Sequence, residues 1–275
     1  MISIGIDAGS RAIKIVLLDM DTLEILATGI ADQAVRQEQQ ALDLLNRLMG
    51  ENHLGSTDIG RTIATGYGRN GIRAADSTVT EITCHAVGVH HLLPSTKTVI
   101  DIGGQDSKVI SLHTNGTVRD FVMNDRCAAG TGCFLEVVAR RLGVELQQMG
   151  ELAGGSQAPA IISSMCVVFA ETEIIGLLAE GTAPPNIIAG VQNSICSRLV
   201  SMTGRNTCPP VVFTGGVALV PGMEAALARV LGQTITTAPQ PQMTGALGAA
   251  LLAARQGQEQ QKENKIFNCQ LTCLL

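Results

Sequence analysis

The sequence is short of aromatic side chains and of basic charge. It contains no tryptophan, one tyrosine and five phenylalanines, and its formal net charge is -5. So few rings argue against a stacking surface for single-stranded nucleic acid, and there is no basic excess to bind a phosphate backbone. We therefore expect no nucleic-acid partner. With aromatic residues scarce and 30 glycines present, the core should consist of aliphatic side chains with close contacts between backbones.

Long hydrophobic runs and a charged leader are also missing. The most apolar stretch, residues 245–254, is too short to span a bilayer. The chain opens directly into a strand-like segment at 2–6. We therefore predict a cytoplasmic protein with no membrane partner. A reducing compartment disfavours structural disulfides, so most of the eight cysteines are expected to be small buried hydrophobic residues.

Strand-like and helix-like segments alternate along the chain, which predicts an α/β fold. Strands are expected at 2–7, 12–19, 23–30, 61–66, 99–102 and 210–214, and helices at 35–49, 82–93, 131–142, 168–180, 185–202 and 243–255. One strand–loop–strand pattern occurs twice, because Lys14 follows Asp7 at the same spacing as Lys108 follows Asp101. The second pattern turns back at Asn115-Gly116, a strong hairpin signal. We infer an internal duplication.

The duplication suggests how the chain divides. Lobe I is expected to comprise residues 1–93 together with 243–256, and lobe II residues 94–242. Residues 257–275 are rich in Gln, Lys and Glu, which predicts a solvated tail. The sequence assigns no role to Cys269 and Cys273 in this tail.

Three glycine-rich turns each follow a predicted strand. They are Asp-Ala-Gly-Ser at 7–10, Asp-Ile-Gly-Gly-Gln-Asp at 101–106 and Thr-Gly-Gly-Val at 214–217. Glycine lets backbone N–H groups approach and hold phosphate oxygens, and carboxylate oxygens suit Mg²⁺. We therefore expect Asp7 and Asp101 to bind Mg²⁺ through water. The groups expected to hold phosphate are Ser10 and the amides of Gly9, Gly103 and Gly104.

These turns, with the small-residue helix at 245–250, resemble the actin, Hsp70 and sugar-kinase superfamily over residues 1 to about 255. The resemblance implies two ribonuclease H-like lobes that close on ATP in a cleft, with the first two turns at the β- and γ-phosphates and the third at the adenosine. Gln105 is expected to orient the attacking water. Lys14 either neutralises phosphate or is a solvated strand lysine. The residues expected to contact the nucleotide are Gly9, Ser10, Arg11, Lys14, Gly103, Gly104, Gln105, Gly215, Gly216, Val217 and Gln242.

Two cysteines stand in loops that lead into predicted helices. Cys127 lies in the segment 123–132 (Met-Asn-Asp-Arg-Cys-Ala-Ala-Gly-Thr-Gly), and Cys166 follows Ser163-Ser164-Met165. The positive end of a helix favours a thiolate, which is a good metal ligand. An iron–sulfur cube needs four thiolates, and two chains related by a twofold axis would supply Cys127 and Cys166 twice each. From spacing alone, two structural thiols remain the alternative.

The longer motifs resemble one family within this superfamily. They are the segments 65–69 (Thr-Gly-Tyr-Gly-Arg), 101–106, 124–132, 163–166 and 169–171 (Phe-Ala-Glu). Together they resemble the ATP-dependent activators of (R)-2-hydroxyacyl-CoA dehydratases, in the BadF/BadG/BcrA/BcrD ATPase family. The resemblance implies a homodimer with one [4Fe–4S] cluster held by Cys127 and Cys166 of both chains. Such a protein takes one electron from a ferredoxin or flavodoxin, binds ATP with Mg²⁺, and passes the electron to a dehydratase.

One position departs from that pattern. Cys133 stands where a basic residue is expected, and it either packs as a small hydrophobic residue or competes as a ligand. Cys84, Cys196 and Cys208 are expected to pack inside or beside their elements.

Two other activities suit the same fold. A small-molecule kinase, acting on a sugar or N-acetylhexosamine, would need a catalytic base near the second turn, and Asp106 is available there. An actin-like filament protein or chaperone ATPase needs no such base. Both alternatives leave Cys127 and Cys166 as core thiols.

Overall fold

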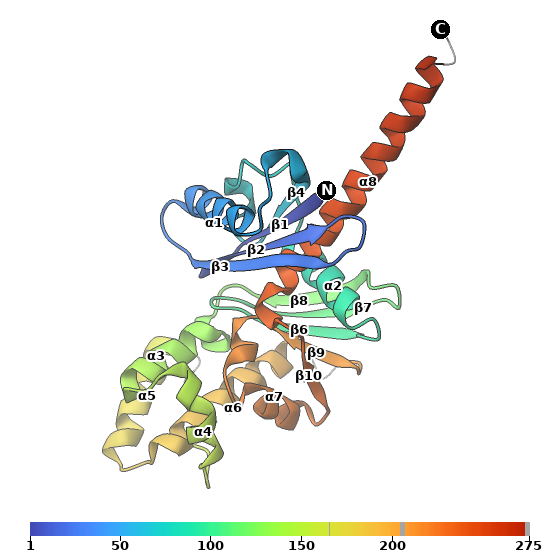
Figure 1. Ribbon diagram of the computed structural model, residues 1–275. Coiled ribbons are helices and arrows are strands. Elements are labelled where there is room, and N and C mark those ends of the chain that lie inside the picture. Colours follow the sequence, from blue (N-terminus) through green and yellow to red (C-terminus); the bar gives the residue numbers. More distant parts are fainter. Residues whose placement is uncertain (165, 204–206, 273–275) are drawn as a thin grey trace. The chain divides into compact units, whose positions relative to one another are not determined.

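The computed structural model shows two compact units (Figure 1), and it describes residues 1–164, 166–203 and 207–272, with 263–272 as backbone only. Unit 1 comprises Met1–His91 and Met243–Leu275, and unit 2 comprises Leu92–Gln242. Each unit contains a five-stranded sheet, so both are α/β.

The sheet of unit 1 begins with an antiparallel meander. β1 pairs with β2, and β2 pairs with β3, whereas β4 runs parallel to β1 on its other side and β5 runs parallel to β4. The strand order is therefore β3-β2-β1-β4-β5. The strands span β1 Ile2–Ala8, β2 Ala12–Asp19, β3 Ile25–Asp32, β4 Ile59–Thr65 and β5 Ser77–Thr78.

Helices cover both faces of this sheet. α1 (Gln37–Glu51) packs its apolar stripe on one face, where Ala64 of β4 joins the same hydrophobic cluster. The neighbouring residue Ile63 points the other way and contacts α2 (Glu81–Leu92) and α8 (Thr244–Thr272) through Cys84 and Ala249. Successive side chains of a strand point to opposite faces, so packing on both sides explains why β1 is buried along its whole length and β4 over residues 62–65.

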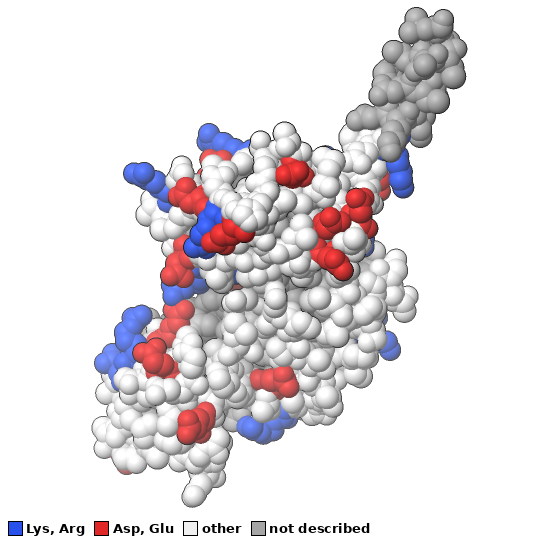
Figure 2. Space-filling view, in the orientation of Figure 1, with Lys and Arg blue, Asp and Glu red and all other residues white. Residues whose placement is uncertain are grey.

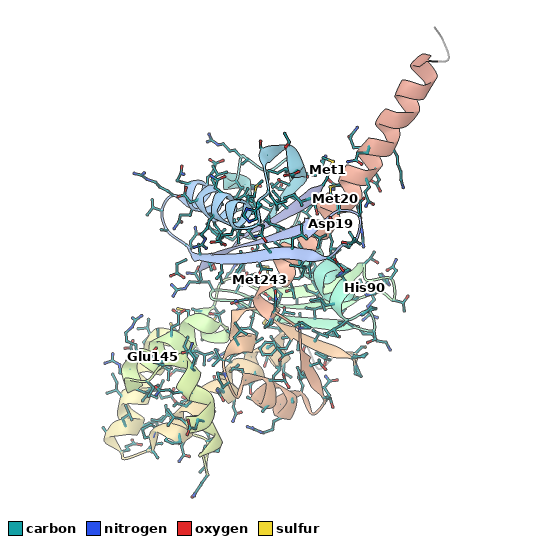
Figure 3. All side chains as sticks on the ribbon, viewed as in Figure 1. Met1, Asp19, Met20, His90, Glu145 and Met243 are labelled. Atoms are coloured by element: carbon teal, nitrogen blue, oxygen red, sulfur yellow. The ribbon has the colours of Figure 1, made fainter. Side chains whose placement is uncertain are left out.

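α8 lies against its neighbours at backbone distance because glycine stands at the contacts. A Cβ at Gly5 would lie 1.9 Å from the Ala246 carbonyl oxygen, and one at Gly248 would lie 1.8 Å from that of Cys84. The predicted close packing of this small-residue helix is confirmed. The helix does not end at Arg255, however, but continues to Thr272, through the segment predicted as a tail. Figure 3 shows Met20 beside this helix, where Gln258 donates a hydrogen bond to the Met20 carbonyl.

The sheet of unit 2 repeats the same topology. β6 pairs antiparallel with β7 and β7 with β8, while β9 runs parallel to β6 and β10 parallel to β9. The order is β10-β9-β6-β7-β8, which matches unit 1 strand for strand and confirms the duplication inferred from the sequence. The strands span β6 Thr98–Ile102, β7 Ser107–Leu112, β8 Val118–Asn124, β9 Val211–Thr214 and β10 Ile235–Thr237.

Five helices gather beside the second sheet (Figure 1) and share its main hydrophobic cluster, in which Phe134 and Phe213 are fully buried. They are α3 Gly132–Leu142, α4 Met149–Gly154, α5 Val167–Ala179, α6 Pro184–Thr203 and α7 Met223–Leu231. The short elements α4, α7, β5 and β10 were not predicted, because they carry too few residues for a clear period.

On the face drawn in Figure 2, acidic and basic side chains are scattered rather than gathered into one patch. Within the described ranges, no helix is both long and apolar enough to cross a membrane.

Candidate functional site

Each sheet carries a carboxylate–ammonium pair at the turn that follows its first strand. In unit 1, Asp7 lies opposite Lys14 in the β1–β2 register, and the Lys14 Nζ is 3.1 Å from the Asp7 Oδ2. Asp7 is buried, and the Lys14 side chain is 18% exposed. Lys14 is therefore an ion-pairing residue, and its interpretation as a solvated strand lysine is wrong.

The equivalent pair in unit 2 is buried more deeply. Asp101 lies opposite Lys108 in the β6–β7 register, and the Lys108 Nζ is 3.1 Å from the Asp101 Oδ2. The same ammonium is 2.8 Å from Asp106, and its side chain is only 2% exposed. Thr214, at the end of β9, donates a hydrogen bond of 2.9 Å to the Asp101 Oδ1. Sequence reasoning noted the spacing of Lys108 but missed it and Thr214 as site residues.

A glycine leaves room in front of each carboxylate. Gly66 follows β4 and Gly215 follows β9, with φ values of +88° and +89°. A Cβ would lie 2.4 Å from Asp7 Oδ1 at the first glycine and 2.9 Å from Asp101 Oδ1 at the second. Only glycine combines this φ with this space. Each glycine and the carboxylate it faces form a close-packed glycine cradle. Carboxylate oxygens are the ligand type that Mg²⁺ prefers, so Mg²⁺ binding by Asp7 and Asp101 stays a prediction.

The amides of two predicted phosphate-binding glycines are used inside their own turns. The Gly9 N–H donates to the Ala12 carbonyl at 3.1 Å, and the Gly103 N–H donates to the Asp106 carbonyl at 2.9 Å. These bonds close both turns in the same way, so the glycines shape the loops rather than present free donors. The expectation that these two amides hold phosphate is corrected accordingly. Ser10, Arg11, Gly104 and Gln105 form the remainder of the two turns, and Arg11 and Gln105 are exposed.

The third glycine turn is held to the end of unit 2. The Gly215 N–H donates to the Pro241 carbonyl at 3.0 Å, which brings the predicted nucleotide residue Gln242 next to this turn. Gly216 is exposed with open space around its Cα, whereas Val217 is buried. The structure thus places Gly215 and Gly216 near Gln242, and their contact with a nucleotide stays a prediction.

The N-terminus of α3 is fastened to the second glycine turn. The Gly132 N–H donates to the Gly103 carbonyl at 2.9 Å, and the Cys133 N–H donates to the Gly104 carbonyl at 2.8 Å. A Cβ at Gly132 would lie 3.1 Å from the Val217 side chain. The first amides of α3, whose positive end was expected to favour a thiolate at Cys127, are thus bonded to the second glycine turn.

Cys127 precedes a single turn of 3-10 helix, Ala128–Gly130, rather than α3 itself. The side chain of Asn124, at the end of β8, holds this loop from both sides. Its Oδ1 accepts the Cys127 N–H at 3.0 Å, and its Nδ2 donates to the Cys127 carbonyl at 2.9 Å. The Cys127 side chain is half-buried and packs against the hydrophobic cluster of unit 2.

Cys166 is exposed and forms the N-cap of α5. The loop before Cys166 is held by the Glu173 carboxylate of α5. This carboxylate accepts hydrogen bonds from the Ser163 N–H and the Ser164 N–H at 2.9 Å each, and from the Ser163 hydroxyl at 2.6 Å. Partial burial would raise the pKa of Glu173, but these hydrogen bonds lower it to about 2. The carboxylate therefore stays charged and holds the loop at every physiological pH. Met165, part of the predicted motif, lies outside the described residues.

The remaining described cysteines divide by burial. Cys84 and Cys196 are buried, which raises the pKa of each thiol to about 12, so both stay protonated and are poor ligands. The packing role expected for them is confirmed. Cys208 is exposed, so the prediction that it packs in the interior is wrong. Cys133 is half-buried in the first turn of α3. The side chain of Cys269 and all of Cys273 lie outside the described residues.

Two units of equal topology, each with an Asp–Lys ion pair beside a glycine cradle, define a two-lobed α/β protein of the actin and sugar-kinase type. A ROK hexokinase from Thermus thermophilus shares this fold at 16% identity, with a TM-score of 0.52 over 93% of this chain and 99% of that one. The sequence pattern of the BadF/BadG/BcrA/BcrD ATPase family matches residues 4–253. The chain belongs to this family, as its motifs predicted.

Close relatives match the chain over nearly its whole length. It is 45% identical over 264 residues to the activator of lactoyl-CoA dehydratase from Anaerotignum propionicum, covering 94% of this chain and 100% of that one. It is 44% identical over 253 residues to the (R)-2-hydroxyglutaryl-CoA dehydratase activating ATPase from Acidaminococcus fermentans, covering 91% and 96%. The activator of the 2-hydroxyisocaproyl-CoA dehydratase from Clostridium difficile, solved with bound ADPNP, matches at a TM-score of 0.89 and 41% identity, covering 96% and 98%.

Proposed function

We propose that this protein is an ATP-hydrolysing activator that delivers a low-potential electron to a 2-hydroxyacyl-CoA dehydratase or a related reductase. The full-length similarity to dehydratase activators supports the role and the acceptor class. The relative with bound ADPNP supports ATP as the ligand of the glycine turns. A ferredoxin or flavodoxin is the proposed donor.

The observation that carries the proposal is the exposed thiol of Cys166 at the start of an apolar helix that its own unit leaves uncovered. On α5 only Ala170 and Ile174 are buried, while Val168, Phe169 and Ile175 are 67%, 69% and 44% exposed. Large apolar side chains that are exposed together on one helix mark an interaction surface. We infer that a second copy of the chain covers α5 and brings its own Cys166 to the same place.

The thiols of this chain suit a cluster shared between two copies. Among the described residues, no three His, Cys, Asp or Glu side chains gather into a metal site, so a single chain does not offer four thiolates. Cys127 and Cys166 from both copies would supply them, and a [4Fe–4S] cluster held there would store one electron at low potential. The N-terminus of α5 would stabilise the negative charge at Cys166.

Nucleotide and thiols are connected through α3. The first amides of this helix bind the Gly103 and Gly104 carbonyls, and near its other end Arg141 donates a hydrogen bond of 3.0 Å to Glu171 of α5. A shift of the second glycine turn on ATP binding would therefore move α3 and, through this ion pair, the helix that begins at Cys166. Asp7 and Asp101 would orient Mg²⁺ through water, and the exposed Gln105 would orient the attacking water.

The kinase alternative is less well supported. Its candidate base, Asp106, is bound by the buried Lys108 ammonium, which also serves Asp101. A carboxylate that is needed to hold this ion-pair cluster together is poorly placed to accept a substrate proton. The exposed Cys166 also contradicts the expectation, common to both alternatives, that this thiol is part of the core.

The proposal is tested by anaerobic purification of the wild type and of Cys127→Ser, Cys166→Ser and Cys208→Ser variants, followed by iron and sulfide analysis. One cluster per dimer requires about two iron atoms per chain in the wild type. We expect iron to be lost in the first two variants. Cys208 is also exposed and is the matched control that should keep its iron. Full iron in Cys127→Ser or Cys166→Ser would refute the ligand assignment, and a colourless wild type with sugar-dependent ADP release would favour the kinase.

A further inference from the structure

One arginine of unit 2 contacts both cysteine loops. Arg198 lies on α6, and its Nη2 donates a hydrogen bond of 2.6 Å to the Ser164 carbonyl, two residues before Cys166. The Arg198 Cβ lies 4.0 Å from the place where a Cβ would stand on Gly130, three residues after Cys127. Its side chain is half-buried.

The Cys127 loop also packs against the helix that carries Arg198, because α6 contacts the 3-10 turn Ala128–Gly130. The same hypothetical Cβ of Gly130 would lie 3.3 Å from the Asn124 Nδ2, the atom that holds the Cys127 carbonyl. Arg198, Gly130 and Asn124 therefore form one packed group under this loop. The Arg198 Cβ thus lies next to the Cys127 loop, while its guanidinium binds the Ser164 carbonyl in the loop of Cys166.

We propose that Arg198 is a positioning residue for the cluster: it ties both cysteine loops to α6 and places a fixed positive charge beside the thiolates. This inference rests on the proposed function. Consecutive Cα atoms are about 3.8 Å apart, so no more than roughly 7.6 Å separates the Cα atoms of Ser164 and Cys166. The guanidinium is thus bound to the backbone two residues before the proposed cluster ligand Cys166.

The charge has a defined consequence for electron uptake. Four thiolates around the cluster make it anionic, and reduction by one electron adds a further negative charge without forming or breaking a bond. A nearby cation stabilises the reduced form more than the oxidised form. Arg198 therefore raises the reduction potential, which keeps the cluster within reach of a ferredoxin-type or flavodoxin-type donor.

The test compares the wild type with Arg198→Lys, which keeps the charge, and Arg198→Gln, which keeps a donor but not the charge. Arg229→Gln is the matched control, because Arg229 also donates a hydrogen bond to a residue of unit 2, in its case the side-chain oxygen of Asn193. Each protein is reconstituted without oxygen and titrated with dithionite, and the reduced fraction is followed by electron paramagnetic resonance. At a given potential, Arg198→Gln should lower the ratio of reduced to oxidised cluster about tenfold, a shift of about 59 mV. Arg198→Lys and Arg229→Gln should stay close to the wild type.

A second measurement tests the positioning role without iron. Amide exchange of residues 127–130 and 161–164 is compared in the iron-free proteins, where Arg198→Gln should exchange about tenfold faster and Arg229→Gln should be unchanged. Unchanged exchange and an unchanged potential in Arg198→Gln would overturn the inference. If the wild type takes up no iron, the proposed function fails instead, and the exchange data still decide whether Arg198 holds the two loops. If Arg198→Gln does not fold, unchanged exchange in Arg198→Lys would support the charge-based contact and faster exchange would overturn it.

Discussion

The ion pairs at the two turns have the same spacing in the sequence, but they differ in burial and therefore in their contribution to stability. Lys14 and Lys108 occupy equivalent positions, each opposite an aspartate across a tight turn. Lys108, however, is 2% exposed and serves two carboxylates, whereas Lys14 is 18% exposed. Removing one partner of a buried pair leaves an uncompensated charge, which costs far more than the loss of an exposed contact.

Lys108→Met should therefore destabilise the protein by about 3–5 kcal/mol, because Asp101 and Asp106 lose their counterion. Lys14→Met, the matched change in unit 1, should cost markedly less, since water reaches that pair. Urea unfolding of both variants measures the difference. Equal losses of unfolding free energy would show that burial does not decide the strength of these pairs.

At the scale of elements, glycine decides how closely α8 approaches unit 1. A Cβ added at Gly248 would lie 1.8 Å from the Cys84 carbonyl oxygen. The backbones of α2 and α8 are therefore in direct contact at this point. A helical glycine is ordinarily unfavourable, by about 0.5–1 kcal/mol relative to alanine. Its presence here is explained by the contact, not by helix propensity.

Gly248→Ala should accordingly destabilise unit 1 by about 1–3 kcal/mol or more, because α8 has to move off α2. Gly50→Ala provides the control, since Gly50 lies in α1 with nothing within 4 Å of its added Cβ. That variant should gain about 0.5–1 kcal/mol. Thermal unfolding of the two variants should therefore shift in opposite directions. A stabilised Gly248→Ala protein would contradict the packing argument.

At the scale of the whole molecule, the exposed apolar residues of α5 are the basis for the proposed dimer. Phe169 is 69% exposed on α5, three residues after the cysteine at its N-cap. Large exposed apolar side chains that cluster on one element mark interaction surfaces. A functional dimer would bury this face and gather the four thiolates in the same step.

Phe169→Glu should weaken the dimer by at least about 2 kcal/mol, because a charge would enter an apolar interface. Sedimentation velocity at several protein concentrations measures the change, and the iron content should fall in parallel because the cluster needs both chains. Leu26→Glu is the control: Leu26 is 42% exposed on β3 of unit 1 and should leave both quantities unchanged. A Phe169→Glu protein that stays dimeric would place the interface elsewhere.

Local patterns in the sequence determined most elements and one half of the site. The pairing of Asp7 with Lys14 and of Asp101 with Lys108 follows from spacing, because residues on either side of a tight turn become cross-strand neighbours. The Asn115-Gly116 hairpin and the long amphipathic helices follow from turn chemistry and period in the same way. The family motifs likewise marked Cys127 and Cys166 without reference to any long-range contact.

Only the tertiary structure decided which distant groups meet. The bonds from Gly132 and Cys133 to the second glycine turn, the glycine cradles in front of Asp7 and Asp101, and the bond from Arg198 to Ser164 join residues well separated in the chain. The same packing turned the first amides of α3 away from Cys127 and engaged the Gly9 and Gly103 amides within their turns. Periodicity reports which face of an element is buried, but the neighbour on that face is selected by the packing of whole elements.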